Sequence, residues 1–139
     1  MVFTIIVIVV LLTLSATHFY WSFGGKWGFD QALPKSANGH RLFTPSKAHS
    51  AAVGTGMLIL VVYLLIRTEL ISVSLPNFIL DYGIWFFALI FVLRAVGDFK
   101  YVGFFKRVRN TNFGKLDSKY YSPLCLLLGI LMILIETSI

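Results

Sequence analysis

The stretch VFTIIVIVVLLTLSATHFYW, residues 2–21, carries no formally charged side chain. An α-helix rises about 1.5 Å per residue, so about 20 apolar residues cross the roughly 30 Å hydrocarbon core of a bilayer. We therefore expect a transmembrane helix over about residues 2–22. No basic region precedes the apolar core, and no small-residue cleavage site follows it. We expect the segment to be retained, not removed as a signal peptide.

The composition extends this expectation to the whole chain. Of 139 residues, 58% are hydrophobic and 13% are charged, whereas a soluble domain has about a quarter charged residues. Three further apolar segments cover about residues 48–66, 77–97 and 120–139. Lipid offers no partners to backbone N–H and C=O groups, so each must be helical. The sequence predicts an all-α membrane protein, a four-transmembrane-helix bundle forming a single domain over residues 1–139, with the bilayer as its partner.

Pro76 and Pro123 stand close to the predicted starts of the third and fourth helices. Proline is tolerated in the first turn of a helix, where its missing N–H has no intrahelical partner to lose. We therefore interpret SPLC, residues 122–125, as the start of the fourth helix.

The cations are distributed unevenly between the loops. Arg67 is the only cation of the second loop, whereas loops 23–47 and 98–119 hold ten: Lys26, Lys35, Arg41, Lys47, Lys100, Lys106, Arg107, Arg109, Lys115 and Lys119. Cationic loops stay on the cytoplasmic side, so both of these loops are expected there and both termini outside. The net charge of +6 then reports topology, and we expect no nucleic-acid binding. The single cysteine, Cys125, allows no intrachain disulfide.

The first loop is too long for a simple connection. Loops beyond about 12–15 residues without structure of their own are usually functional or disordered. Its glycines and apolar residues, among them Trp27 and Phe29, argue against disorder. We expect a folded cytoplasmic cap on the mouth of the bundle.

Arg94 and Asp98 stand four residues apart at the end of the third predicted helix, and therefore share one helical face. Two interpretations remain open. Arg94 snorkels to the interface with Asp98 as its counter-ion, or the pair belongs to a binding or catalytic site, the default hypothesis for ionisable residues at membrane depth.

Other polar and aromatic residues are predicted at the same end. Ser15, His18 and Trp21 fall in one sector of the first helix, and imidazole is well suited to proton transfer or metal ligation. His18 and Asp98 are the candidate catalytic residues. The candidate ligand-binding set, with Arg94 as an anion clamp and the indoles as walls, is His18, Trp21, Trp27, Arg94, Asp98, Asp117 and Tyr121.

One face on each of two predicted helices, the fourth and the second, is expected to contact another helix. The fourth helix aligns Tyr121, Cys125, Gly129, Met132 and Glu136 in one seam. The second helix pairs Ser50 with Gly54 and Ala52 with Gly56, with a partner helix in the same chain or in a second copy. No CxxC or HExxH spacing occurs, so no metal site is expected. Enzymatic activity, cofactor and oligomeric state stay open.

The chain resembles a small bacterial integral-membrane family, domain of unknown function 3995. The resemblance rests on THFYWSFGGKWG (17–28), LP (33–34), LFTP (42–45), RAVGDFKYVGFFKR (94–107) and TNFGKLDSKYYSPLC (111–125). It implies four helices and a bacterial membrane, which we expect to be the cytoplasmic (inner) membrane. It brings no activity and no catalytic residues.

Three functions are compatible with these observations. The first is a four-helix bundle whose polar, aromatic-lined cytoplasmic mouth binds a small or lipid-like molecule. The second is a structural or accessory membrane subunit without a ligand. The third is a small oligomeric transporter or channel, which would need polar residues through the middle of the membrane. Near the middle of the membrane, the predicted spans have only Thr13 and Thr55 as polar residues.

Overall fold

The structure, a computed structural model, describes residues 1–139 and contains no strand. Its long helices are α1 (Val2–Ser22), α2 (Lys47–Arg67), α3 (Asn77–Val96) and α5 (Ser122–Thr137). The last continues α4 (Asn112–Leu116) and a π-helical turn, η2 (Asp117–Tyr121), and a short 3₁₀ helix, η1 (Asp30–Ala32), lies in the first loop. Four helices are long and apolar enough to cross a bilayer. This confirms the predicted all-helical class, and the chain is a multi-pass membrane protein.

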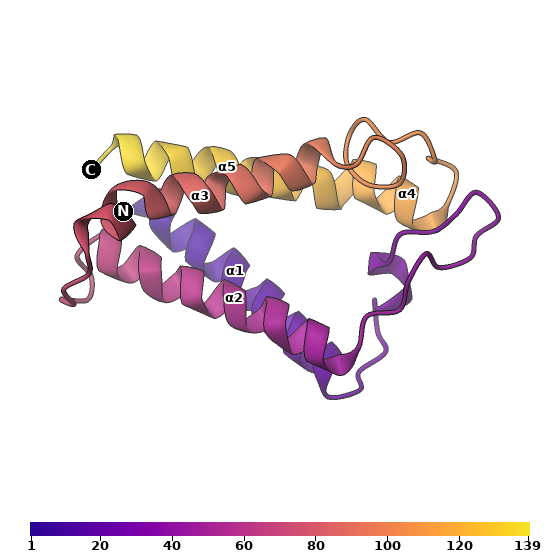
Figure 1. Ribbon diagram of the computed structural model, residues 1–139, viewed down its shortest axis with the longest axis horizontal. Helices are drawn as coiled ribbons and strands as arrows, with labels where there is room; N and C mark the ends of the chain where they lie inside the picture. The colour runs from indigo at the N-terminus through magenta and orange to yellow at the C-terminus, as the bar shows by residue number, and fades with distance from the viewer.

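The helices form two pairs that meet at an angle. α1 packs along α2, and α3 packs along α5. Figure 1 shows the pairs converging at the end that holds both termini and diverging toward the end that holds the first and third loops. The molecule therefore has one closed end and one open end.

The shared core lies at the closed end. Its buried residues come from all four long helices: Val7, Leu11, Leu60, Val61, Tyr63, Leu64, Ile84, Ala88, Leu128, Leu131, Met132 and Ile135. In α1 the core stops at Leu11, and in α5 it begins at Leu128. Toward the open end, the two helix pairs have no common buried core.

Small residues allow close approach within each pair. The Ser15 hydroxyl donates to the Gly54 carbonyl of α2 at 2.8 Å, and Phe19 fills the space that a Cβ on Gly54 would occupy. Gly129 of α5 lies against Val92 and the Ala88 carbonyl of α3. The Ser50/Gly54 face of α2 is therefore used within the chain, as small residues are at membrane helix contacts.

The fourth spanning helix begins earlier than predicted. The sequence predicted a start at residue 120 with Pro123 in the first turn, but the helix starts at Asn112, where the Thr111 hydroxyl accepts from the Gly114 N–H. Pro123 lacks an N–H and would clash with a carbonyl one turn back. The chain widens there, and the Ser122 N–H bonds to the Asp117 carbonyl, five residues back. The π-turn lets the helix continue through the proline.

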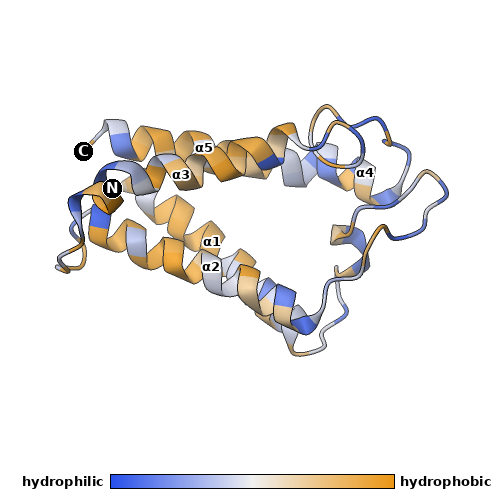
Figure 2. Cartoon of the chain, viewed as in Figure 1, coloured by the Kyte–Doolittle hydropathy of each residue, from blue (hydrophilic) through white to orange (hydrophobic).

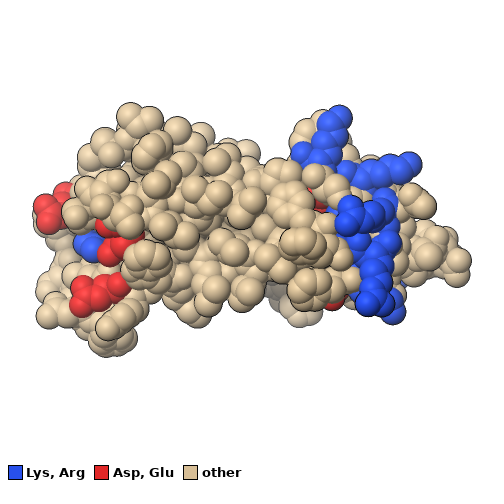
Figure 3. Space-filling model, turned by 90° about the horizontal axis from the view of Figure 1, so that it is seen from above, with Lys and Arg blue, Asp and Glu red and all other residues tan.

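Charge is segregated between the two ends, as Figure 3 shows, and Figure 2 shows the long helices between them as mainly hydrophobic. The open end, with its loops and the last turn of α3, holds eleven of the twelve cations and three acids. The closed end has Arg67 with Glu69, Asp81 and Glu136. There Arg67 binds Glu136 through two hydrogen bonds, at 2.7 and 3.1 Å. The long helices between the two ends are predominantly apolar.

Candidate functional site

Asp117 is the centre of a buried ionic cluster at the open end. It is the first residue of the π-turn and is 0% exposed. Its Oδ1 accepts from Arg94 Nη2 at 2.8 Å, and its Oδ2 accepts from the Gly103 N–H at 2.8 Å and from Lys106 Nζ at 3.1 Å. The cluster joins α3, the third loop and η2, and its two cations and one carboxylate leave a net positive charge.

Lys106 is the second unusual member of this cluster because its side chain is 0% exposed. Besides Asp117, its ammonium donates to the Gly103 carbonyl at 3.0 Å and to the Ser118 hydroxyl. A buried charge is tolerated only when it is paired and hydrogen-bonded. All three ammonium donors are thus used inside the chain, and Lys106 has no donor left for a ligand.

The third loop can enclose this lysine because two glycines allow two segments of its backbone, around residues 96–97 and 102–103, to come into close contact. Gly97 and Gly103 both have positive φ, +85° and +90°, a region open to glycine at little cost. A Cβ on Gly103 would meet the Val96 carbonyl, and one on Gly97 would meet the Val102 carbonyl. Arg109 donates to the Lys106 and Phe104 carbonyls. The loop is therefore a folded cap.

Asp98 does not pair with Arg94, contrary to the prediction of an ion pair one helical turn apart. α3 ends at Val96, so Asp98 lies outside the helix. Its Oδ1 accepts from the N–H groups of Lys100, Tyr101 and Val102 at 2.8–3.0 Å. Partial burial raises the pKa of this carboxyl, but the three N–H groups outweigh that effect and hold its pKa below the usual value. Asp98 organises the turn that starts the third loop.

Two donors in this cluster have no partner. Arg94 Nη1 and Ser122 Oγ are both buried, and neither makes a hydrogen bond within the chain. Buried polar atoms are nearly always paired, so each exception asks for an explanation. Arg94 uses only Nη2 for Asp117, and a third of its side chain is exposed. Ser122 follows the π-turn directly and joins the cluster through its backbone N–H, which bonds to the Asp117 carbonyl. The cluster thus offers two unused polar groups and excess positive charge, which suits an anion.

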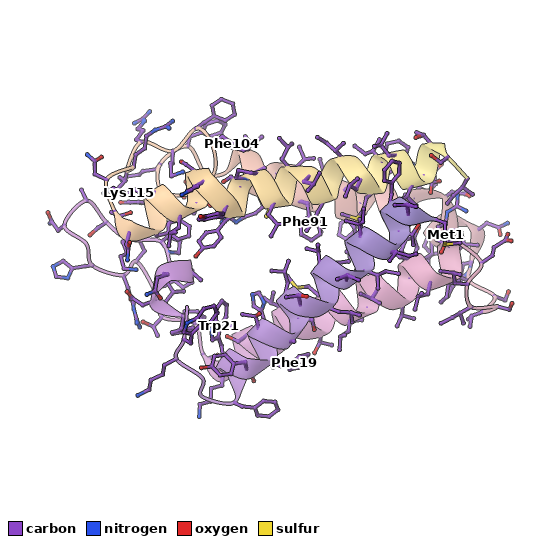
Figure 4. All side chains as sticks on the ribbon, turned by 180° about the vertical axis from the view of Figure 1, so that it is seen from behind. Met1, Phe19, Trp21, Phe91, Phe104 and Lys115 are labelled. Atoms are coloured by element: carbon purple, nitrogen blue, oxygen red, sulfur yellow. The ribbon has the colours of Figure 1, made fainter.

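The aromatic candidates form a separate group at the end of α1. His18 Nδ1 bonds to the Leu14 carbonyl at 2.7 Å, and the ring stands edge-on to Trp21 at 5.1 Å. Trp21 lies beside the first loop (Figure 4) and donates its indole N–H to the Trp27 carbonyl at 2.8 Å. Trp27 as a whole residue is 80% exposed. The chain holds Trp27 through its backbone, and its ring faces outward.

The two groups are connected through the first loop. Tyr121 donates to the Gln31 carbonyl at 3.2 Å, next to η1, and stacks at a tilt on the buried Phe113. Arg94, Asp117 and Tyr121 lie together, since Arg94 bonds to Asp117 and Tyr121 ends the π-turn that Asp117 begins. His18, Trp21 and Trp27 also lie together. No hydrogen bond, ion pair or ring contact joins the His18 group to the Arg94 group.

Sequence reasoning missed Lys106 and Ser122 as members of the cluster. Lys106 is one of six cations in the predicted third loop and looks in sequence like any other topology signal. Ser122 was interpreted as a residue of a helix start. The one available signal was Pro123, because a proline inside a longer helix requires a local rearrangement before it.

The potential metal ligands of the chain are dispersed. No three His, Cys, Asp or Glu side chains come together in a way that could hold a metal ion. Cys125, one turn beyond Ser122, is partly buried and free. The arrangement is best suited to binding through positive charge and hydrogen-bond donors.

Comparison with family models shows which family the chain belongs to. It belongs to DUF3995, whose description is "Protein of unknown function", and the match covers residues 11–132. Comparison with curated proteins and with solved structures gives no match.

Proposed function

We propose that this DUF3995 member binds an anionic, lipid-like molecule at the open end of its helix bundle, with Arg94 as the anchor of the anionic group. The observation that carries the proposal is the pair of buried, unpartnered donors, Arg94 Nη1 and Ser122 Oγ. Arg94 bonds to the Asp117 carboxylate through Nη2, and Ser122 bonds to the Asp117 backbone carbonyl through its N–H, in a cluster where cations exceed carboxylates. A carboxylate or phosphate would use the free donors and balance the charge.

The lipid-like character of the ligand is supported by the packing around this cluster. The core shared by the two helix pairs ends at Leu11 in α1 and Leu128 in α5. Beyond it the pairs diverge (Figure 1), and Cys125 on α5 stays only partly buried. An apolar tail between the pairs would remove such surface from contact with bulk lipid or water. Tyr121, the last residue of the π-turn, then flanks its polar end.

We further propose that the open end is cytoplasmic and that the membrane is the bacterial inner membrane. The support is the segregation of eleven cations to that end, which follows the positive-inside rule. Under this arrangement the ligand comes from the inner leaflet or the cytoplasm. A catalytic role for His18 or Asp98 has less support, because Asp98 is committed to its turn.

The test uses the full chain in detergent or nanodiscs, with co-purified molecules and added oleate as probes read by native mass spectrometry. Ser122→Ala removes a hydroxyl that has no partner in the chain, so we expect unchanged thermal stability and lower occupancy. Arg94→Lys keeps a charge for Asp117 but loses the planar fork, and we expect it to lower occupancy further. Arg67→Lys, at the closed end, is the matched control and should bind like the wild type.

A structural or accessory subunit is the second candidate, and one observation favours it. Asp117 already has three donors within the chain, so the cluster also serves to fix the third loop on α3. If Ser122→Ala and Arg94→Lys retain the wild-type complement of bound molecules, the binding proposal is wrong and this candidate stands. A transporter has the least support, because Thr13 and Thr55 are both bonded to carbonyls of their own helices.

A further inference from the structure

A second polar cavity, separate from the Arg94 cluster, lies where the first loop meets the start of α2. Its volume is about 570 Å³, and it is lined mainly by polar residues of the first loop and by the ends of α1 and α2. Three of its lining side chains are cationic: Lys26, Arg41 and Lys47. Its one acid, Asp30, already accepts from Arg41 at 2.8 Å and lies 3.4 Å from Lys35. The cavity therefore carries an excess of positive charge.

The charge that remains available comes from Lys26 and Lys47. Both are exposed, and neither takes part in an ion pair. Lys47 is the first residue of α2, and its ammonium lies over Gly24, 3.8 Å from the place of a Cβ there. In the first turn of this 21-residue helix, the His49 N–H bonds to the Ser46 hydroxyl and the Ser50 N–H to the Ser46 carbonyl, which leaves the N–H groups of Lys47 and Ala48 without a partner in the helix. Together these groups create the positive potential that binds anions at helix starts.

Ser50 supplies an independent indication that a ligand belongs here. The residue is only 5% exposed, it lines the cavity, and its hydroxyl has no hydrogen-bond partner within the chain. The neighbouring serine, Ser46, is by contrast fully used, because its hydroxyl accepts from the His49 N–H in a capping box. The enclosed unpaired side-chain atoms of the chain are Arg94 Nη1 and Ser122 Oγ, so the Ser50 hydroxyl is reachable from the cavity that it lines and is free to donate to a ligand there.

We infer that this cavity binds a phosphate group, with Lys26 and Lys47 neutralising its charge and Ser50 donating a hydrogen bond. Phosphate accepts several donors from different directions, and two point-charge ammonium groups suit it. Trp21 and Phe29, edge to face at 5.8 Å, form an apolar wall. The phosphate belongs to a lipid headgroup or to a soluble phosphate ester, since both present the same chemistry. The site is formed without Arg94, Asp117 or Ser122 and does not depend on the function proposed for them.

The test follows Trp21 fluorescence in the full chain carrying Trp27→Phe and Trp85→Phe, which leaves Trp21 as the single indole. Nanodiscs of digalactosyldiacylglycerol, a lipid without phosphate, provide the starting state. In one arm sodium phosphate is titrated against sodium chloride at equal ionic strength. In the other arm the mole fraction of phosphatidylglycerol in the discs is raised. A saturable response in the first arm assigns a soluble phosphate, and one confined to the second assigns a lipid headgroup. Either supports the site.

Matched variants decide whether the response is specific. Lys26→Gln and Lys47→Gln should each weaken binding about tenfold, as expected for a charge-assisted hydrogen bond, and Ser50→Ala by roughly fivefold. Lys119→Gln removes an exposed cation outside the cavity and should leave binding unchanged. Because Lys26 is exposed, Lys26→Gln should fold normally, and it still tests the site if Lys47→Gln or Ser50→Ala fails to fold. No saturable response in either arm, or equal losses for Lys119→Gln and Lys47→Gln, would overturn the inference.

Discussion

Arg94 bonds to Asp117, 23 residues further along the chain, and not to Asp98, one helical turn away. This choice follows from where α3 ends. The chain leaves the helix after Val96 and turns sharply at Gly97, so Asp98 faces the backbone of its own turn. Asp117 then arrives from the start of the fourth spanning helix. The pair ties α3 to that helix and closes the third loop between them.

Replacing Asp117 by Asn is expected to destabilise the protein strongly. Lys106 would keep its charge in a fully buried place and lose its only carboxylate. Breaking one side of a buried pair typically costs about 3–5 kcal/mol. Thermal unfolding in nanodiscs measures the loss. Asp81→Asn, an exposed acid without an ion pair at the other end, should stay within about 0.5 kcal/mol of the wild type. Equal stabilities for the two variants would show that Lys106 does not depend on Asp117.

The helices could be predicted from the sequence because one physical requirement, apolar length, determines them. Charges bound the second helix closely, at Lys47 and Arg67, whereas Asp81 and Arg94 lie inside the third helix, near its ends. The start of the fourth helix could not be predicted in this way, because residues 112–121 are polar and contain Gly114. That helix begins on a threonine cap and continues through a π-turn. Both features depend on local geometry and give little hydropathy signal.

The candidate site was predictable as a region but not as a set of contacts. Arg94, Asp117 and Tyr121 were identified as an ionic and aromatic group at one end of the chain, and the structure brings them together. Their partners Gly103 and Lys106 come from the third loop, whose path depends on two positive-φ glycines. Spacing along one helix favoured the Arg94–Asp98 pair. To predict the contact between Arg94 and Asp117, 23 residues apart, one would have to know the path of the third loop between them.

Asp98→Ala is expected to loosen the start of the third loop without unfolding the bundle. Three N–H groups, those of Lys100, Tyr101 and Val102, would lose their common acceptor. Because the turn is exposed, water can replace the carboxylate as the acceptor, and the loss in free energy of unfolding should be about 1 kcal/mol. Hydrogen exchange of these three amides measures the effect. Asp98→Asn keeps an oxygen acceptor and should show a smaller increase in exchange. A slower exchange in Asp98→Ala than in the Asn variant would contradict this role.

The same turn should weaken in acid. Backbone donors hold the pKa of Asp98 below its ordinary value despite partial burial, so its ionised form stabilises the folded turn. That contribution is fully present above the unfolded pKa, about 3.9, and is lost as the pH falls through the lower folded pKa. Exchange of the Val102 amide, corrected for its intrinsic pH dependence, should therefore be flat near neutrality and rise below about pH 4. Asp98→Asn cannot titrate and should lack this rise.

Two glycine substitutions should separate the helix contact from the lipid-facing surface. A Cβ on Gly129 would lie 2.8 Å from Val92 Cγ2 and 3.3 Å from the Ala88 carbonyl, whereas nothing lies within 4 Å of the same position on Gly56. We expect Gly129→Ala to cost about 1–3 kcal/mol through overpacking. Gly56→Ala should be neutral or stabilising by up to about 1 kcal/mol through helix propensity. Thermal unfolding of both variants in the same lipid checks the order, and a destabilised Gly56→Ala would indicate that a second copy covers this face.

The orientation in the membrane can be tested with single cysteines in a Cys125→Ser background. Lys106 is unsuitable because it is buried, but Lys115 is exposed at the open end (Figure 4), and Leu70 is exposed at the closed end. If the positive-inside rule holds for this chain, a membrane-impermeant thiol reagent added to intact cells should label Leu70→Cys and spare Lys115→Cys. After permeabilisation both should react. Labelling of Lys115→Cys in intact cells would place the cationic loops outside, and an inner-leaflet source for the ligand would then be ruled out.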